Sequence, residues 1–213
     1  CDNSYCTPIY QKPIELGIDL SIQSATKYIS GHSDVVAGVL SGSKQMIERI
    51  FNSEYMNICS GIQPFNAWLL LRGLRTLPIR LEKITKTTQE IVDFLQNHSL
   101  VEQVIYPLDP SFKQVELAKQ QMSGGCGLLT FMLKVDSVEQ IENFCNALKH
   151  VLMAVSWGGY ESLIIPKCAT MAKNQFNKTD QWHKSLRLYV GLEEADYIIK
   201  DLENGFLAIS STS

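Results

Sequence analysis

Residues 17–34 read GIDLSIQSATKYISGHSD, and this stretch decides the fold. Apolar and polar residues alternate over 18–23, which predicts a half-buried strand, because successive side chains of a strand point to opposite faces. Directly after it, Lys27 stands among the hydroxyl residues Ser24 and Thr26. A lysine amine binds an aldehyde and hydroxyls bind phosphate, so this arrangement suits a phosphate-bearing aldehyde cofactor such as pyridoxal phosphate. The stretch therefore predicts a ligand site at the end of a strand, where α/β proteins place ligands.

The rest of the chain alternates between strand and helix patterns, which indicates an α/β class. Proline cannot continue a helical ladder, so Thr76-Leu77-Pro78 predicts a break between two helices and a domain hinge there. Residues 35–40 are a continuous apolar run and predict a fully buried strand. The other predicted elements are a helical turn at 14–17, strands near 101–106, 127–134, 151–155 and 186–191, and helices at 44–51, 64–74, about 77–97, 114–121, 138–150 and 195–206.

The bulk composition limits the classes of partner. The chain has 213 residues, 45% of them apolar, and a net charge of −3 at a sequence pI of about 5.8. This balance gives no electrostatic footprint for nucleic acid, and no apolar run approaches the ~20 residues of a membrane span. No signal peptide is visible and none of the six cysteines has zinc-site spacing, so we expect no metal site and a reduced cytoplasmic protein. Three cysteines in apolar surroundings are expected to be buried free thiols: Cys126, Cys145 and Cys168.

Two further stretches carry groups suited to a substrate. Residues 154–163, AVSWGGYESL, combine the Ser156 hydroxyl, the flat ring of Trp157 and glycines that allow close approach. A glycine hairpin with a packed tryptophan is the alternative. Arg187 lies in an apolar strand pattern, and a buried charge needs a partner. A substrate carboxylate suits the guanidinium fork, whereas a pair with Glu193 or Glu194 would be purely structural.

Asp2-Asn3 and, about two dozen residues later, the SATKYISGHSD stretch at 24–34 resemble the Cys/Met-metabolism enzymes that depend on pyridoxal phosphate. The resemblance implies the C-terminal part of an aspartate aminotransferase-like, fold type I protein. It implies that Lys27 binds the cofactor and acts as catalytic base, while Asp2 pairs with the pyridine nitrogen. It also implies that Ser24 and Thr26 bind the cofactor phosphate, although ordinary hydrogen bonding at a strand end is the alternative for both hydroxyls.

The same resemblance assigns substrate binding to Ser156, Trp157 and Arg187. The SWGGYESL wording is most similar to cystathionine β-lyases, which implies β-elimination of cystathionine or cysteine to a thiol, pyruvate and ammonia. The γ-lyases, γ-synthases and sulfhydrylases of the family are the alternative, and a non-catalytic fragment that serves assembly is an alternative of another class. A role in trans-sulfuration and methionine biosynthesis, and a homotetramer or other homo-oligomer, are further implications.

The resemblance covers only the C-terminal half of the family's length, so we expect a fragment of a longer enzyme. Residues 1–76 are predicted to be the end of a large cofactor-binding domain and 77–213 a small C-terminal domain. The missing half is expected to supply an aromatic that stacks on the cofactor ring and a backbone cup for its phosphate. An exposed sheet edge and apolar face are expected to favour association.

Overall fold

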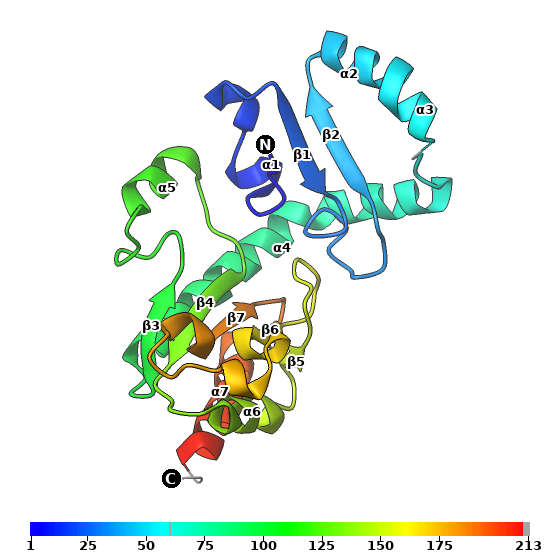
Figure 1. Cartoon of the computed structure of the whole chain (residues 1–213). Helices are drawn as coiled ribbons and strands as arrows, with labels where there is room; N and C mark the ends of the chain where they lie inside the picture. Colours follow the sequence, from blue (N-terminus) through cyan, green and yellow to red (C-terminus); the bar gives the residue numbers. More distant parts are fainter. Residues whose placement is uncertain (60, 211–213) are drawn as a thin grey trace.

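The computed structural model describes residues 1–59 and 61–210, and it confirms an α/β chain. An N-terminal part built on the strand pair β1 (Leu20–Ser24) and β2 (Gly38–Gly42) is joined by the long helix α4 (Pro64–Asn97) to a five-stranded sheet (Figure 1). The remaining elements of the N-terminal part are α1 (Thr7–Tyr10), η1 (Pro13–Leu16), α2 (Lys44–Ile50), η2 (Phe51–Tyr55) and α3 (Met56–Ile58). The predicted turn that ends at Gly17 is confirmed, and its left-handed φ of 86° is the reason for a glycine there.

The predicted half-buried strand at 18–23 is present, but its polar side chains are buried instead of its apolar ones. The side chains of Ser21 and Gln23 are buried, while 51% of the Ile22 surface is exposed. The prediction of a fully buried strand at 35–40 is also wrong, because β2 begins only at Gly38 and all its residues are at least partly exposed. The apolar side chains Ile22 and Leu40 of this strand pair face a pocket that α2 and η2 line from the other side, so they are not enclosed as in a core.

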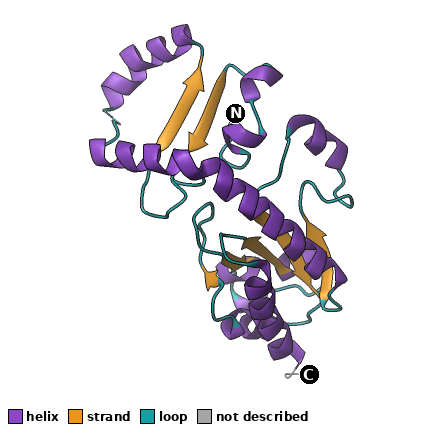
Figure 2. Ribbon diagram, turned by 180° about the vertical axis from the view of Figure 1, so that it is seen from behind, coloured by secondary structure: helices purple, strands orange, loops and turns teal. Residues whose placement is uncertain are grey.

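Helix α4 runs without interruption through Pro78, so the predicted break at 76–78 is wrong. A proline inside a helix costs about 3 kcal/mol and removes the hydrogen bond to Leu74 O. Buried side chains on both sides of the proline compensate, since Leu77 and Leu81 are almost fully buried on the same face. Figure 2 shows the helix extending from beside β1 and β2 to the larger sheet. Tertiary packing therefore outweighs the local helix breaker.

The larger sheet has the strand order β3-β4-β7-β6-β5, antiparallel except for the β5–β6 pair. Its strands are β3 (Val101–Ile105), β4 (Leu128–Leu133), β5 (Leu152–Met153), β6 (Leu163–Pro166) and β7 (Ser185–Tyr189). Strand β6 was not predicted, and it begins at Leu163, the last residue of the AVSWGGYESL stretch. Helices α6 (Val138–Ala147) and α7 (Ala195–Ser210) pack on this sheet, whereas α5 (Val115–Gln121) lies away from it, toward α1 (Figure 1). The short turns are η3 (Lys167–Thr170), η4 (Lys173–Gln175) and η5 (Gln181–Lys184).

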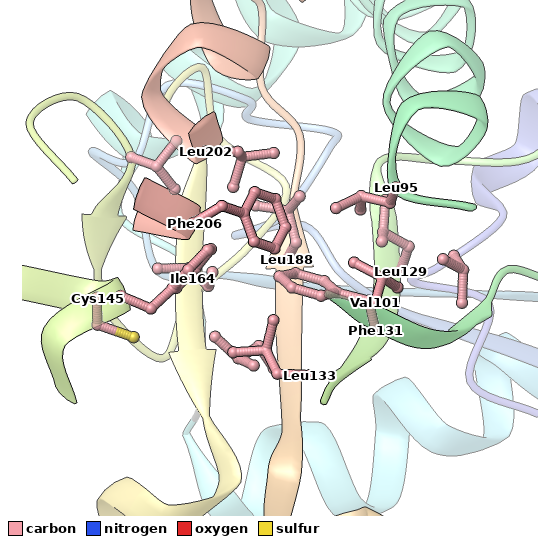
Figure 3. Packing of buried hydrophobic residues seen from close by; sticks show 14 of the residues in the cluster. Leu95, Val101, Leu129, Phe131, Leu133, Cys145, Ile164, Leu188, Leu202 and Phe206 are labelled. Carbon is pink, nitrogen blue, oxygen red and sulfur yellow. The ribbon is translucent and has the colours of Figure 1, made fainter. Parts of the chain in front are cut away.

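The main core lies between one face of this sheet and the helices α6, α7 and the second half of α4. Figure 3 shows Phe206 of α7 beside Leu188 of β7, with Phe131 of β4 next to them. The three cysteines predicted to be buried free thiols are confirmed as such, and burial raises the pKa of Cys145 to about 12. Within the described residues, no helix combines the length and apolar content that a membrane crossing needs.

Candidate active site

Lys27 lies in a hydrogen-bonded turn that directly follows β1. Its backbone N–H donates to Ser24 O at 3.0 Å, and its carbonyl accepts from Gly31 N–H at 2.8 Å. The neighbours Ala25 and Tyr28 are almost completely buried, so they anchor the turn on both sides of the lysine. The Lys27 side chain is only half-buried. The sequence therefore places one accessible amine on a turn whose flanking residues are fixed by packing.

The loop between β5 and β6 brings Ser156 and Trp157 to this amine. Lys27 Nζ donates to Ser156 Oγ at 3.3 Å and lies 5.3 Å from the centre of the Trp157 ring. Gly158, with a φ of 84°, makes this approach possible, because a Cβ there would lie 2.8 Å from Lys27 Cβ. The two stretches that the sequence analysis singled out, 129 residues apart at these positions, thus meet at one place.

Side chains that sequence reasoning missed connect the Lys27 turn to the loop between β5 and β6 and to Gly127. Ser33 Oγ lies 2.8 Å from both carboxylate oxygens of Glu161. The Tyr28 hydroxyl accepts from Gly127 N–H at 2.9 Å, and the Tyr28 ring contacts Trp157 edge to face at 5.7 Å between centroids. The sequence contains all these residues within the quoted motifs or close to them, but nothing in their spacing shows which of them touch.

Arg187 of β7 lies on the same face of the sheet as Tyr189, between strands β4 and β6. Its Nη2 donates to the carbonyl of Val155, next to Ser156, and partial burial lowers the pKa of the guanidinium. The alternative of a structural ion pair is contradicted. Glu193 instead accepts from the backbone and hydroxyl of Ser162, and Glu194 pairs with Lys83 at 2.6 Å. The remaining N–H groups of the fork are directed to no carboxylate among the described residues.

Asp2 lies beside β1, where it forms a parallel bridge with Ile22. Its carboxylate accepts from the backbone N–H of Ser4 at 2.8 Å, and hydrogen bonds from the Ser4 side chain and backbone lower its pKa. Ser4 Oγ in turn accepts from Ser24 N–H at 2.6 Å, which ties this segment to the strand end before Lys27. No contact between the Asp2 and Lys27 side chains is present among the described residues.

The two predicted phosphate-binding hydroxyls differ in their surroundings. Thr26 Oγ1 donates to Ala37 O at 3.2 Å and accepts from Ala37 N–H at 3.0 Å. Its single donor is thus already used, as the strand-end alternative requires. The Ser24 hydroxyl has no such partner in the part of the chain that the structure describes, so it is free to donate to a phosphate.

These residues fit pyridoxal phosphate in their donor chemistry. The half-exposed Lys27 amine suits the aldehyde, the Asp2 carboxylate remains ionised and suits a protonated ring nitrogen, and the Ser24 hydroxyl suits a phosphate oxygen. The hydroxyl of Thr26 fits only after it leaves Ala37 O. Within residues 1–59 and 61–210, no three His, Cys, Asp or Glu side chains are grouped to hold a metal ion.

The chain is similar to known enzymes along almost its whole length. The chain is 38% identical over 213 residues to L-methionine gamma-lyase of Pseudomonas putida, covering 97% of this chain and 53% of that protein. It is 37% identical over 211 residues to cystathionine gamma-lyase of Homo sapiens, covering 97% and 52%. Cystathionine gamma synthase of Xanthomonas oryzae pv. oryzae, solved in complex with cystathionine, superposes with a TM-score of 0.89 at 32% identity over 100% of this chain and 56% of that one.

The chain thus spans about half the length of the relatives it matches. The sequence profile of the Cys/Met metabolism PLP-dependent enzymes matches residues 1–207, which is nearly the whole chain. The chain therefore belongs to the family of Cys/Met metabolism PLP-dependent enzymes.

Proposed function

We propose that this chain supplies the lysine and the substrate-binding half of the active site of a carbon–sulfur lyase. The proposed reaction is the β-elimination of cystathionine or cysteine to a thiol, pyruvate and ammonia. The observation that supports it best is the meeting of Lys27, Ser156 and Trp157 on facing loops, with Arg187 bonded to the residue before Ser156. Because the chain spans half the length of its relatives, the proposal concerns the protein that contains it.

The cofactor, when bound, supplies an electron sink for the negative charge that develops at the substrate Cα. The chain's own residues do the rest. Arg187 and Ser156 bind the substrate carboxylate, which fixes the direction of the Cα–H bond. The unprotonated amine of Lys27 takes the Cα proton, and the electron pair expels the thiolate from Cβ. Water then converts the remaining carbon skeleton to pyruvate and ammonia.

In the same proposal Asp2 keeps the ring nitrogen protonated, since hydrogen bonds from Ser4 favour its ionised form. Ser24 donates to the phosphate. Trp157 provides a flat wall beside the Lys27 amine and limits the directions from which a substrate reaches it.

Elimination or replacement at Cγ is the second candidate, and the relatives favour it. The methionine and cystathionine relatives described above are both named gamma-lyases, whereas the SWGGYESL wording favours β-chemistry. Cystathionine separates the two reactions cleanly. β-Elimination gives pyruvate and homocysteine, and γ-elimination gives 2-oxobutyrate and cysteine, so identification of the keto acid decides between them.

The test of the site uses the chain, Lys27→Ala and the control Lys200→Ala, which changes an exposed lysine on α7. Each protein is mixed with pyridoxal phosphate, reduced with borohydride and mapped by mass spectrometry. We expect the cofactor on Lys27 in the parent chain and in Lys200→Ala, together with a visible absorption band that Lys27→Ala lacks. Labelling spread over surface lysines, with no band and no keto acid released from cystathionine, would favour the non-catalytic fragment for this chain.

A further inference from the structure

Arg80 of α4 is a buried cation that sequence reasoning passed over. Its side chain is directed at the underside of the turn that carries Lys27. Nη1 donates to Tyr28 O at 2.8 Å, and Nη2 donates to Ile29 O at 3.4 Å and to Gly73 O at 2.9 Å. Nε donates to Thr76 Oγ1 at 3.0 Å. One guanidinium therefore joins the main chain of the Lys27 turn to the main chain of α4.

The arginine has no carboxylate partner among the described residues, although only 6% of its surface is exposed. A buried charge without an opposite charge is costly, and burial accordingly lowers the pKa of this guanidinium. The neutral oxygens around the guanidinium offset that cost, because they accept hydrogen bonds from most of its N–H groups. In return, the carbonyls of Tyr28 and Ile29 obtain donors that the turn does not give them, since the backbone hydrogen bonds of the turn are accepted by Ser24 O, Ala25 O and Lys27 O.

Two glycines shape this contact. A Cβ at Gly73 would lie 2.4 Å from Ser30 O and 2.5 Å from Ile29 O, so the helix and the turn touch by their backbones. A Cβ at Gly31, where φ is 68°, would lie 2.0 Å from Arg80 Nη1. The turn therefore packs closely on the guanidinium and on α4. A larger residue at Gly31 would displace the guanidinium, and one at Gly73 would push the turn away from the helix.

We propose that Arg80 is a positioning residue for Lys27. By donating hydrogen bonds to the carbonyls of Tyr28 and Ile29, Arg80 keeps the Lys27 amine within reach of Ser156. This inference rests on the proposed function of Lys27. The Tyr28 side chain is fixed separately by Gly127 and Trp157, so Arg80 controls the backbone of the turn. A lysine that must reach both a cofactor and a substrate proton needs such support, because reacting groups tolerate only about 0.5 Å of displacement.

The test compares the chain with Arg80→Met, Arg80→Lys and the control Arg75→Met, which changes an exposed arginine of the same helix. The first readout is amide hydrogen exchange at Ser30 and Gly31, whose N–H groups donate within the turn. We expect about tenfold or faster exchange at these two amides in Arg80→Met, which corresponds to the loss of one or two hydrogen bonds. Exchange in β4 and β7 is expected to stay unchanged and serves as the internal reference.

The second readout is the rate at which pyridoxal phosphate is trapped on Lys27 by borohydride. We expect it to fall about tenfold in Arg80→Met, to fall less in Arg80→Lys, and to match the parent chain in Arg75→Met. Exchange that rises equally in the turn and in β4 and β7, or trapping that does not change, would overturn the positioning role. If Arg80→Met does not fold, Arg80→Lys provides the same comparison.

The two readouts separate this inference from the proposed function. Hydrogen exchange needs no cofactor. If the amides of Ser30 and Gly31 exchange slowly in the parent chain and quickly only in Arg80→Met, the result supports Arg80 as the anchor of the turn even if no lyase activity is found. Absence of trapping on Lys27 in the parent chain would overturn both the proposed function and the positioning role, and leave Arg80 as a structural anchor.

Discussion

Asp201 of α7 shows how one buried carboxylate organises the approach to the candidate site. Its oxygens accept from the backbone N–H groups of Lys149, His150 and Val151 at 2.8–2.9 Å. Burial by itself would raise the pKa of this carboxyl, but the three N–H donors outweigh burial and lower it below 3.8. The residue thus fixes the segment that leads into β5 and onward to Ser156.

We expect Asp201→Asn to lower the free energy of unfolding near neutral pH by about 1–3 kcal/mol, since an amide is a weaker acceptor and turns N–H groups toward the donors. The folded-state pKa lies below the unfolded value, so this stabilisation is complete above the unfolded pKa and is lost as pH falls through the folded one. Urea unfolding at several pH values measures it. The gap between the two proteins should narrow in acid below about pH 4.

Glu203→Gln is the matched control for Asp201→Asn, because it makes the same replacement of a carboxylate by an amide at an exposed position on the same helix. Its unfolding free energy should stay within about 0.5 kcal/mol of the parent value. A gap between Asp201→Asn and the parent chain that is independent of pH would contradict the assigned role of the ionised carboxylate.

Thr26 offers a second test at the scale of a residue, because its hydroxyl both donates to and accepts from the backbone of Ala37. Thr26→Val removes the hydroxyl at constant shape and should cost about 1–3 kcal/mol in chemical unfolding, whereas Thr26→Ser should cost less. If Thr26 serves only a phosphate, Thr26→Val will instead leave unfolding unchanged and weaken only the binding of pyridoxal phosphate.

At the scale of elements, α4 and β1 show the limits of reading periodicity along the chain. Pro78 does destabilise the helix locally, but the helix continues because its buried face packs on both sides of the proline. The alternation at 18–23 is a correct signal for a strand, but it does not tell which face is covered. By contrast, the helix at 44–51 and the strand at 101–106 were predicted almost to the residue, because capping and period agree with their packing.

The packing of α4 on the Lys27 turn makes a prediction for Gly73→Ala. In an exposed helix this change is worth up to about 1 kcal/mol of stabilisation. Here the new Cβ would meet the carbonyl oxygens of Ile29 and Ser30 at 2.4–2.5 Å, so backbone must move at a cost of about 1–3 kcal/mol. We expect the net effect to be destabilising in thermal unfolding. The control Arg72→Ala, at an exposed position one residue away, should be nearly neutral, and a higher melting temperature for Gly73→Ala would refute the close contact.

At the scale of the whole molecule, the candidate site depends on a cluster that joins the two parts of the chain. Tyr28 of the N-terminal part packs with Leu77 of α4 and Tyr189 of β7 in one buried group. The boundary between residues 1–76 and 77–213 remains a prediction, and the continuous α4 crosses it. A substrate bound between Lys27 and Arg187 would contact both parts, so their relative position sets the geometry of the site.

Several large apolar side chains on the first half of α4 are exposed, including Phe65, Trp68 and Leu71 at 56–66%. We expect the chain to self-associate through this face, because exposed apolar surface of this kind mediates association. Sedimentation velocity should show a sedimentation coefficient that rises with protein concentration. Phe65→Ser with Trp68→Ser should reduce association, while Glu82→Ser, an exposed polar control on the same helix, should not; equal association in all three would exclude this face.

The sequence by itself determined the α/β class and the family, because these follow from local patterns and from motifs whose residues are adjacent in the chain, and the same motifs predict Lys27 as the lysine that binds the cofactor. Only the tertiary structure decided that α4 is continuous, that Arg187 contacts Val155 rather than Glu193 or Glu194, and that Arg80 lies beneath the Lys27 turn. The physical reason is that packing and hydrogen bonding between residues far apart in the chain outweigh local preferences, and no pattern along the sequence encodes which distant partners meet.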